Sequence, residues 1–392
     1  MSPQMPRPAL VPRLQPFTST IFAEMTALAT STGSVNLGQG FPDTDGPPAM
    51  LEAAKDALFG GANQYPPGPG RPELRAAIAA HRTRYELHYD PDSEILVTAG
   101  ATEAITASLL ALTESGDEVI VIEPYYDSYT AAVALAGATR RVVALATDES
   151  GGFTLDIDAV RAAITSRTRA IIVNSPHNPT GTVFNTAELR ELAAVCVEHD
   201  LIAITDEVYE HLTFGVEHTP LATFEGMAAR TVSISSAGKT FNCTGWKIGW
   251  VCANQELVAA VRAAKQFMTF VSGGPLQPAV AYALENELSW VGQLRDDLAR
   301  KHDRLAAGLA DAGFAVRPSA GTYFICADVR PLGFEDATEL AWRLPERAGV
   351  AAVPVGVFTD HPEPFKHLLR FAFCKRDDVI DEAITRLNKL SR

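Results

Sequence analysis

Cysteine is scarce in this sequence, and its placement excludes two kinds of stabilising framework. The 392 residues include five cysteines, and no two of them form a CxxC pair. An odd and scattered set argues against both a disulfide framework and a zinc ribbon. These cysteines are Cys196, Cys243, Cys252, Cys326 and Cys374. We therefore expect a protein of a reducing compartment, the cytoplasm.

Long apolar runs and clusters of positive charge are missing as well. No run reaches the roughly 18 apolar residues that a membrane span needs, and the proline-rich residues 1–16 lack the apolar core of a signal peptide. The formal net charge is -14, with no Lys/Arg-rich run. Such a balance favours solubility and argues against a surface for nucleic acid or an anionic membrane. We expect neither as a partner.

Two common ligand-binding motifs are also absent. The nine histidines show no HExxH or comparable spacing, so the sequence gives no support to a metal site. No GxGxxG segment follows an expected strand, which argues against a dinucleotide-binding fold. The chemistry therefore has to come from other side chains.

Short apolar strands alternate with helices through the middle of the chain. This alternation predicts an α/β fold with a mostly parallel, doubly wound sheet that helices cover on both faces. The expected strands are 95–98, 118–122, 141–146, 170–173, 201–205, 231–235 and 248–252. The expected helices between and after them are 102–112, 129–136, 157–163, 186–199 and 256–265.

The two ends of the chain have a different texture, and the length suits one large and one smaller domain. We expect a loose arm over residues 1–15, and helices ending near Gly33 and at 50–58 and 74–85. A long helical stretch, 278–312, precedes a smaller α+β domain. Its expected elements are 314–316, 322–327, 337–344, 350–354, 369–373 and a final helix at 377–390. The expected division is 1–47 (arm and part of the small domain), 48–290 (large domain) and 291–392 (small domain).

The segment 230–251 contains the residue around which the chemistry is organised. Lys239 follows a buried strand directly, after the small residues Ser235 to Gly238. A partly desolvated lysine has a lowered pKa, and its neutral amine can form a Schiff base. A lone lysine of this kind is more often an exposed loop residue, so the other strand ends decide between the two interpretations.

Polar residues follow several of the expected strands, at the edge of a parallel sheet where ligands bind. The glycine turn before Thr102 leads into a helix N-terminus, which is either a phosphate site or an ordinary N-cap. Tyr126 follows the next strand and either stacks on a flat ring or packs in the core. Asn178, between prolines, either binds a ligand or closes an Asx turn.

An acid at the end of a buried strand needs a cation or a protonated nitrogen nearby. Asp206 occupies such a position, and the phenol of Tyr209 follows it. A lysine, a carboxylate, a phenol, an amide and a phosphate site on one sheet edge match the needs of pyridoxal phosphate. That cofactor requires an imine lysine, an acid for its pyridine nitrogen, and donors for its phenolate and phosphate oxygens.

Eight segments of the chain, in order, resemble those of the fold-type I, class I/II pyridoxal-phosphate-dependent aminotransferases. They are NLGQGFPD, NQYPPGPG, VTAGATEA, EPYYDSY, NSPHNPTG, TDEVYEHL, SISSAGKTFNCTGWKIGW and LLRFAFCK, and the match extends from about Val35 to Leu390. The resemblance implies the fold of that family, with a seven-stranded sheet in the large domain. It also implies a ping-pong transfer of an amino group from an amino acid to a 2-oxo acid such as 2-oxoglutarate.

The resemblance assigns a role to each candidate residue. Lys239 becomes the Schiff-base lysine and proton shuttle, and Asp206 the partner of the pyridine nitrogen. Asn178 and Tyr209 would bind the phenolate oxygen, Tyr126 would stack on the ring, and the phosphate would be held by Ala101, Thr102, Ser236 and Lys247.

Three further residues are assigned through the resemblance alone. Tyr65 would reach the phosphate of the other subunit's cofactor, which implies a homodimer with shared active sites. Arg370 would clamp the substrate carboxylate bidentately, with the backbone N–H of Gly40 as a second contact and Asn178 nearby. Without the resemblance, Arg370 would be interpreted as part of a surface ion pair.

The sequence differs from the aspartate-type members of this family at two places, and these differences indicate to which branch of the family it is similar. Lys247 stands where many aspartate-type members have arginine, and residues 270–278, FVSGGPLQP, contain no arginine for a distal carboxylate. A dedicated aspartate transaminase is therefore disfavoured. The overall texture resembles the N-succinyl-diaminopimelate aminotransferases of lysine biosynthesis. Two alternatives stay open: a kynurenine/glutamine/methionine-type transaminase, and a cysteine-conjugate β-lyase.

Overall fold

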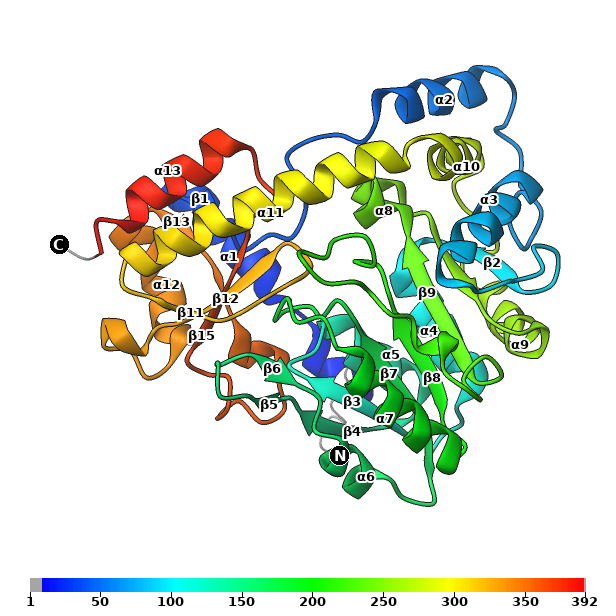
Figure 1. Cartoon of the computed structure of the whole chain (residues 1–392), viewed down its shortest axis with the longest axis horizontal. Coiled ribbons are helices and arrows are strands. Elements are labelled where there is room, and N and C mark those ends of the chain that lie inside the picture. The colour runs from blue at the N-terminus through cyan, green and yellow to red at the C-terminus, as the bar shows by residue number, and fades with distance from the viewer. Residues whose placement is uncertain (1–8, 391–392) are drawn as a thin grey trace, which may run out of the picture.

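A seven-stranded sheet forms the centre of the molecule. The computed structural model describes residues 9–390 (Figure 1). In order across the sheet, the strands are β2 (Ile95–Thr98), β10 (Gly249–Cys252), β9 (Thr231–Ser236), β8 (Ile202–Asp206), β7 (Thr168–Asn174), β3 (Glu118–Glu123) and β4 (Thr139–Ala144). Only β10 runs against its neighbours, and the other ladders are parallel. The expected mostly parallel sheet is confirmed.

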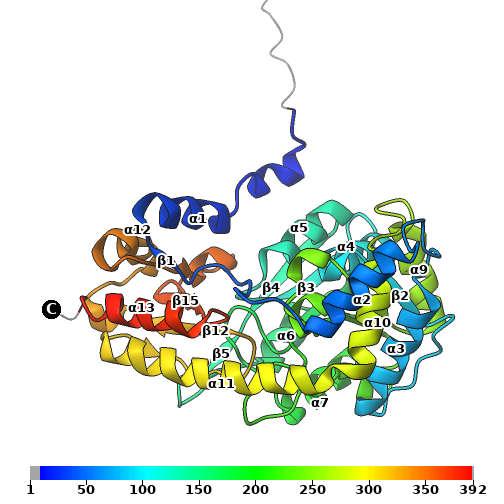
Figure 2. The same cartoon turned by 90° about the horizontal axis from the view of Figure 1, so that it is seen from above.

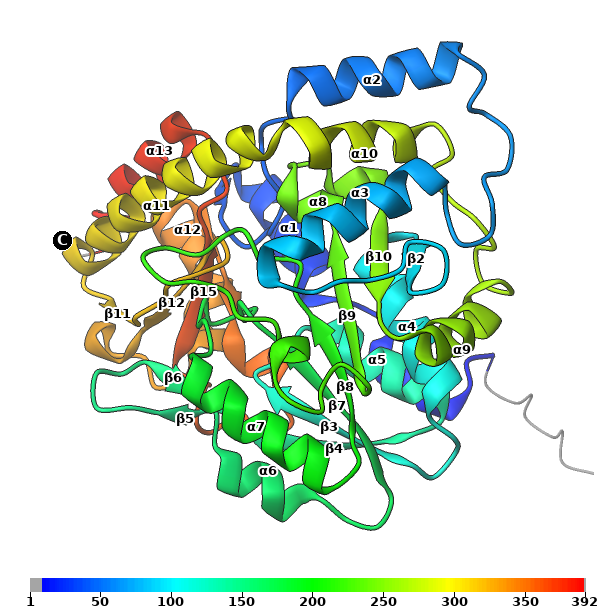
Figure 3. The same cartoon turned by 45° about the vertical axis from the view of Figure 1, so that its right-hand side comes forward.

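The apolar residues of each strand alternate between two cores, because successive side chains of a strand point to opposite faces. In β3, Val119 and Val121 pack with the helices of one face, whereas Ile120 and Ile122 pack with those of the other. A sheet buried on both faces needs apolar residues at consecutive positions, which is why β3 reads as an unbroken apolar run. Figure 3 shows the strands of this sheet with helices in front of them and behind them.

Helices cover both faces of this sheet. On one face lie α4 (Gly100–Leu112), α5 (Asp127–Ala136) and α9 (Gln255–Lys265). On the other lie α2 (Pro48–Phe59), α3 (Pro72–Arg82), α6 (Ile157–Ala163), α7 (Thr186–Glu198) and α10 (Leu276–Asn286). Local sequence sets their ends: α7, for instance, begins with a capping box between Asn185 and Glu188.

A second, antiparallel sheet lies beside the first. Its strands, in order, are β11 (Ala315–Val316), β12 (Phe324–Asp328), β15 (Leu368–Ala372) and β14 (Val353–Pro354). Around it lie α11 (Leu288–Asp311), α12 (Ala337–Ala348) and α13 (Asp377–Leu387). The N-terminal helix α1 (Ile21–Thr32) packs into the same core through Met25 and Ala29 (Figure 2). The chain then forms β1 (Val35–Asn36), which pairs in parallel with β13 (Val350–Ala351).

Most expected elements lie within a few residues of their observed bounds, and the helical stretch expected at 278–312 is confirmed as two successive helices, α10 (Leu276–Asn286) and α11 (Leu288–Asp311). The chain leaves the helical conformation at Glu287 (φ -113°, ψ 17°). Helix α10 packs against α2 and α3, whereas α11 packs against α13. The break separates a helix that packs beside the large sheet from one that packs beside the second sheet, and neither glycine nor proline marks the position.

Several smaller differences are local. Helix 74–85 ends at Arg82, and a 3-10 turn (Thr83–Tyr85) follows. The strand expected at 141–146 ends at Ala144, and β5 (Ala146–Thr147) forms a separate hairpin with β6 (Phe153–Thr154). The final helix ends at Leu387 rather than at residue 390.

The expected loose arm, 1–15, is corrected in part. Residues 1–8 lie outside the described residues, but Pro12–Phe17 form a 3-10 helix. The domain limits 1–47, 48–290 and 291–392 stay a prediction. Within residues 9–390, no helix combines the length and hydropathy needed to cross a membrane. All five cysteines are buried free thiols.

Candidate active site

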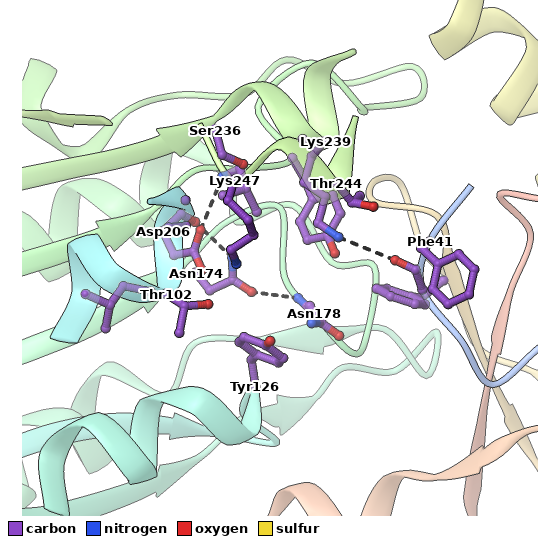
Figure 4. Close-up of a pocket in the computed structure, with 18 of the residues that line it drawn as sticks. Phe41, Thr102, Tyr126, Asn174, Asn178, Asp206, Ser236, Lys239, Thr244 and Lys247 are labelled. Atoms are coloured by element: carbon purple, nitrogen blue, oxygen red, sulfur yellow. Dashed lines mark hydrogen bonds between the residues drawn. The ribbon is translucent and has the colours of Figure 1, made fainter. Parts of the chain in front are cut away.

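A cavity of about 310 Å³ lies at the carboxyl edge of the large sheet. Its wall is built from the ends of β7, β8 and β9, from the starts of α4 and α5, and from two residues of the second sheet, Phe324 and Arg370. It contains every expected site residue except Tyr65: Gly40, Ala101, Thr102, Tyr126, Asn178, Asp206, Tyr209, Ser236, Lys239, Lys247 and Arg370. Several of them surround the cavity in Figure 4.

Lys239 lies in the one-turn helix α8 (Ala237–Thr240), directly after buried β9. Its Nζ donates to Tyr323 Oη at 2.6 Å and lies 3.4 Å from the carbonyl oxygen of Gly40. Burial lowers the pKa of Lys239 to about 8. A substantial fraction of the amine is therefore neutral at a mildly alkaline pH, as a nucleophile requires. The interpretation of Lys239 as an exposed loop residue is wrong.

Asp206, the last residue of β8, is buried with neutral partners. Its Oδ2 accepts a hydrogen bond from Tyr129 Oη at 2.7 Å, and its Oδ1 accepts one from the Val208 N–H at 3.3 Å. Burial raises the pKa of this carboxyl, and the Tyr129 hydrogen bond opposes that rise. Within residues 9–390 no ion pair involves Asp206. A protonated ring nitrogen in the cavity would supply the missing cation.

The start of α4 offers a site for an anion. A glycine with φ +76°, Gly100, turns the chain from β2 into the helix, and the first residues of the helix, Gly100 to Thr102, line the cavity. A Cβ on Gly249 of β10 would lie 2.6 Å from the carbonyl carbon of Gly100, so the close approach requires glycine. Lys247 brings a cation to the same point, with its Nζ 3.2 Å from where a Gly100 Cβ would be.

The N-cap of α4 is Ala99, so the interpretation of Thr102 as the N-cap is wrong. Thr102 lies in the first turn and lines the cavity, as do Ala101 and Ser236. The four expected phosphate ligands thus surround the helix N-terminus.

Of the two tyrosines that follow β3, one lines the cavity and the other lies in the core. Tyr126 lines the cavity, whereas its neighbour Tyr125 is buried and donates to Asp360 Oδ1 at 2.7 Å. The Asn178 side chain accepts from Arg370 at 2.9 Å rather than closing an Asx turn. Tyr209, the expected phenol donor, is buried at the cavity wall, and burial raises its pKa. It therefore remains protonated and able to donate at neutral pH.

Arg370 is a buried cation without a carboxylate partner among the described residues. Its guanidinium donates to Asn178 Oδ1 and to the Gly38 carbonyl oxygen, both at 2.9 Å, and its Nε has no partner. The ring centroid of Phe324 lies 4.0 Å from the guanidinium carbon. Only 2% of Arg370 is exposed, so the interpretation as a surface ion pair is wrong. Such a guanidinium can receive a ligand carboxylate.

Three residues of the site escaped prediction from the sequence. Tyr129 lies one helical turn after Tyr126 and could have been found from that spacing. Asn174, the last residue of β7, donates to the Asp206 carbonyl and accepts from the Asn178 N–H at 2.7 Å. Tyr323 comes from the second sheet region, and nothing in the sequence connects it with Lys239.

Tyr65 lies on the surface, 82% exposed, in edge-to-face contact with Phe270 at 5.7 Å. The single chain does not bring it to the cavity. Its expected role in a second subunit stays a prediction.

A buried ion network lies behind the site. His81, Glu210 and His211 present ligand-type atoms within 4.8 Å of one another. However, the Glu210 carboxylate is already held by Arg82 (3.1 Å), by Arg84 (2.7 Å) and by a hydroxyl of β9. Two guanidiniums on this carboxylate oppose the binding of a further cation, so we interpret the group as structural.

The side chains of the cavity fit pyridoxal 5'-phosphate. A neutral-capable amine, a buried carboxylate without a cation, and an anion site with a lysine are the complements of its aldehyde, ring nitrogen and phosphate. When bound, the cofactor supplies an electron sink for a carbanion. Lys239 can then take up and return a proton at Nζ, while Asp206 stabilises positive charge and Arg370 orients a carboxylate.

Comparisons with known proteins agree with this geometry. The family model described as aminotransferase class I and II matches residues 32–387. The chain is 59% identical over 391 residues to a probable N-succinyldiaminopimelate aminotransferase of Mycobacterium tuberculosis, covering 97% of this chain and 98% of the relative. It is 39% identical to a methionine aminotransferase of Escherichia coli, covering 95% and 96% of the two chains.

A solved structure gives the same result. The N-succinyldiaminopimelate aminotransferase from Mycobacterium tuberculosis superposes with a TM-score of 0.96 at 60% identity, covering 97% of this chain and 100% of that one. The expected family and cofactor are confirmed. The chain belongs to the class I and II aminotransferases, and it is a pyridoxal-phosphate-dependent transaminase.

Proposed function

We propose that this protein is an N-succinyl-LL-diaminopimelate aminotransferase of lysine biosynthesis, which exchanges amino groups with 2-oxoglutarate by a ping-pong mechanism. The observation that carries the transaminase chemistry is the meeting of Lys239, Asp206 and Arg370 in one cavity. The support for the substrate is the 59% identity, over nearly the whole of both chains, to a relative with that activity in its name.

The proposed roles follow from the contacts. Lys239 binds the cofactor and moves the proton, while Asp206, ionised with the help of Tyr129, pairs with the ring nitrogen. Asn178 and Tyr209 bind the phenolate oxygen, and Tyr126 stacks on the ring. The phosphate is held by Ala101, Thr102, Ser236 and Lys247.

Arg370 and the N–H of Gly40 hold the substrate α-carboxylate in this proposal. The guanidinium has only neutral partners to release, the side-chain oxygen of Asn178 and a backbone carbonyl. Gly40 needs to be glycine, because a Cβ there would lie 2.6 Å from the Phe324 ring. The backbone can therefore approach a bound carboxylate closely.

A kynurenine/glutamine/methionine-type activity is the second candidate. Aromatic side chains favour it, since Phe22, Phe41 and Phe324 all line the cavity and suit an apolar substrate side chain. The methionine aminotransferase relative supports the same alternative.

A half-reaction screen separates these substrates. The loss of the absorbance band of the lysine-bound cofactor is followed with N-succinyl-LL-diaminopimelate, L-methionine, L-kynurenine and L-glutamine. We expect kcat/KM for the first to exceed the others by about tenfold or more. A faster reaction with methionine or kynurenine would contradict the proposed substrate. Sustained pyruvate release from L-cystathionine without an oxo acid would instead identify a β-lyase.

We also propose a homodimer in which Tyr65 completes the partner's phosphate site. Tyr65 is exposed and its ring contacts Phe270, which is exposed as well. Phe59 (87% exposed) and Phe267 (86% exposed) lie on the same two stretches of the chain. Exposed aromatic residues are enriched at protein interfaces. Light scattering should give twice the chain mass, and a monomeric, fully active enzyme would contradict the proposal.

The remaining expectations extend this proposal. The packing of α1 into the core of the second sheet supports an arm that belongs to the small domain, within the limits 1–47, 48–290 and 291–392. Limited proteolysis would test these domain limits, since cleavage should occur near them.

The five free, buried thiols support a reducing compartment, the cytoplasm.

A further inference from the structure

The ε-amino group of Lys239 has a specific partner, the phenol of Tyr323. Tyr323 immediately precedes β12 and is 1% exposed. Its Oη lies 2.6 Å from Lys239 Nζ and 2.5 Å from the carbonyl oxygen of Gly40. One hydroxyl therefore joins the lysine that follows β9 to the segment of Gly40, which also lines the cavity.

The direction of these two bonds follows from their chemistry. A carbonyl oxygen can only accept, so the Tyr323 hydroxyl donates its hydrogen to Gly40. Its oxygen is then left to accept a hydrogen from Lys239 Nζ. The Gly40 carbonyl is a second, longer acceptor for the same nitrogen, at 3.4 Å. Two of the hydrogens on Lys239 Nζ are thus directed at the Tyr323 hydroxyl oxygen and the Gly40 carbonyl oxygen.

We propose that Tyr323 is a positioning residue for the transamination: it holds the free amino group of Lys239 so that the remaining position on Nζ faces the reacting carbon. The inference rests on the proposed role of Lys239 as proton shuttle. In the neutral amine that position is the lone pair, which takes one proton and gives the ammonium form. The ammonium returns the same proton from the same position. Tyr323 keeps its own proton throughout and donates it in the hydrogen bond to the Gly40 carbonyl oxygen.

Tyr323 itself is not a base in this account. Burial raises its pKa well above the usual value, so it remains a neutral phenol at the pH of the reaction. The ring of Tyr209 packs edge-on against it, with centroids 5.2 Å apart, and limits its movement. A fixed, neutral acceptor orients an amine without competing for its proton.

The Tyr323→Phe variant removes only the hydroxyl. With α-deuterated L-glutamate as donor, we expect kcat to fall by about 10- to 100-fold. KM for glutamate should change less than about threefold, since Arg370 is intact. The deuterium isotope effect on kcat should rise, because proton transfer becomes more limiting. A purely structural role for Tyr323 would leave the isotope effect unchanged.

A second readout uses the cofactor-free protein and does not depend on turnover. Trace acetylation with acetic anhydride, quantified at Lys239 by mass spectrometry, gives the pKa of its amine. The acceptor Tyr323 favours the charged form, so Tyr323→Phe should lower this pKa. The other groups that act on Lys239 are the same in both proteins; they are Cys374, Asp206, Arg370 and Lys247.

Tyr125→Phe is the matched control, because it removes a buried phenol hydrogen bond, to Asp360, outside the cavity. It should leave kcat, the isotope effect and the pKa of Lys239 unchanged. The inference would be overturned if Tyr323→Phe had the wild-type kcat and left the pKa of Lys239 unchanged, in an experiment in which Lys239→Ala is inactive. Full turnover by Lys239→Ala would instead overturn the proposed function. If Tyr323→Phe and the control Tyr125→Phe changed kcat, the isotope effect and the pKa of Lys239 alike, the effect would be structural, and the inference would be overturned.

Discussion

Tyr129 on α5 donates a 2.7 Å hydrogen bond to Asp206 at the end of β8. It is the side-chain donor that opposes the effect of burial on this carboxyl. Because hydrogen bonds to an ionised carboxylate favour the charged form, Tyr129 keeps Asp206 available for a cationic ring nitrogen.

Tyr129→Phe should therefore raise the pKa of Asp206 further. The acid limb of the pH profile of kcat should move to higher pH, because more of the carboxyl is protonated at any given pH. A hydrogen bond to a charged group is worth about 1.5–3 kcal/mol, so kcat at neutral pH should fall by about tenfold or more. An unchanged acid limb would show that Tyr129 does not act through Asp206. Tyr125→Phe again serves as the control.

The pKa of Lys239 sets the pH dependence of cofactor uptake. Only the neutral amine is nucleophilic, and burial lowers the pKa of Lys239 to about 8. Stopped-flow absorbance should show the uptake rate rising with pH and levelling off above about pH 8. A midpoint near the ordinary lysine value of about 10.4 would contradict the desolvated site.

Arg370 should act on both substrates of the ping-pong cycle. Arg370→Ala should raise KM for the amino acid and the 2-oxo acid alike, with a loss of about 2–5 kcal/mol in binding. Arg370→Lys keeps the charge but loses the planar fork, so it should recover only part of the loss. Steady-state kinetics with both substrates checks this. Unchanged KM values would exclude carboxylate binding by Arg370.

The network behind the site should matter for stability. Arg82 pairs with Glu207 at 2.9 Å and with Glu210 at 3.1 Å, and all three side chains are buried. Arg82→Met would leave the buried carboxylate of Glu207 without its guanidinium and Glu210 with Arg84 alone, which should cost about 3–5 kcal/mol of unfolding free energy in urea. Arg161→Met removes the exposed pair with Glu198 and should change the stability little. Equal effects would contradict the account.

The sheet was predictable because its signal is local. In β3, four consecutive apolar residues from Val119 to Ile122 can only be buried on both faces. The break at Glu287 was not, because neither glycine nor proline marks the point at which α10 and α11 part to pack against different partners. The 3-10 turn after Arg82 was not predictable either, since neither glycine nor proline marks it.

The site divides in a similar way. Asp206 and Lys239 were predictable because each follows a buried strand, and such ends meet at one edge of a parallel sheet. Tyr323 was not, because it reaches Lys239 from another sheet, more than 80 residues further along the chain. Arg370 gained its assignment from a family resemblance alone, and its buried, carboxylate-free environment now supports that role independently.

Lys239→Ala tests the central claim most directly. The purified variant is mixed with pyridoxal 5'-phosphate, and its visible spectrum and its turnover of L-glutamate with an oxo acid are recorded alongside circular dichroism. The account predicts a folded protein without the absorbance band of a lysine-bound cofactor and without transaminase turnover. A folded variant with full turnover would contradict it.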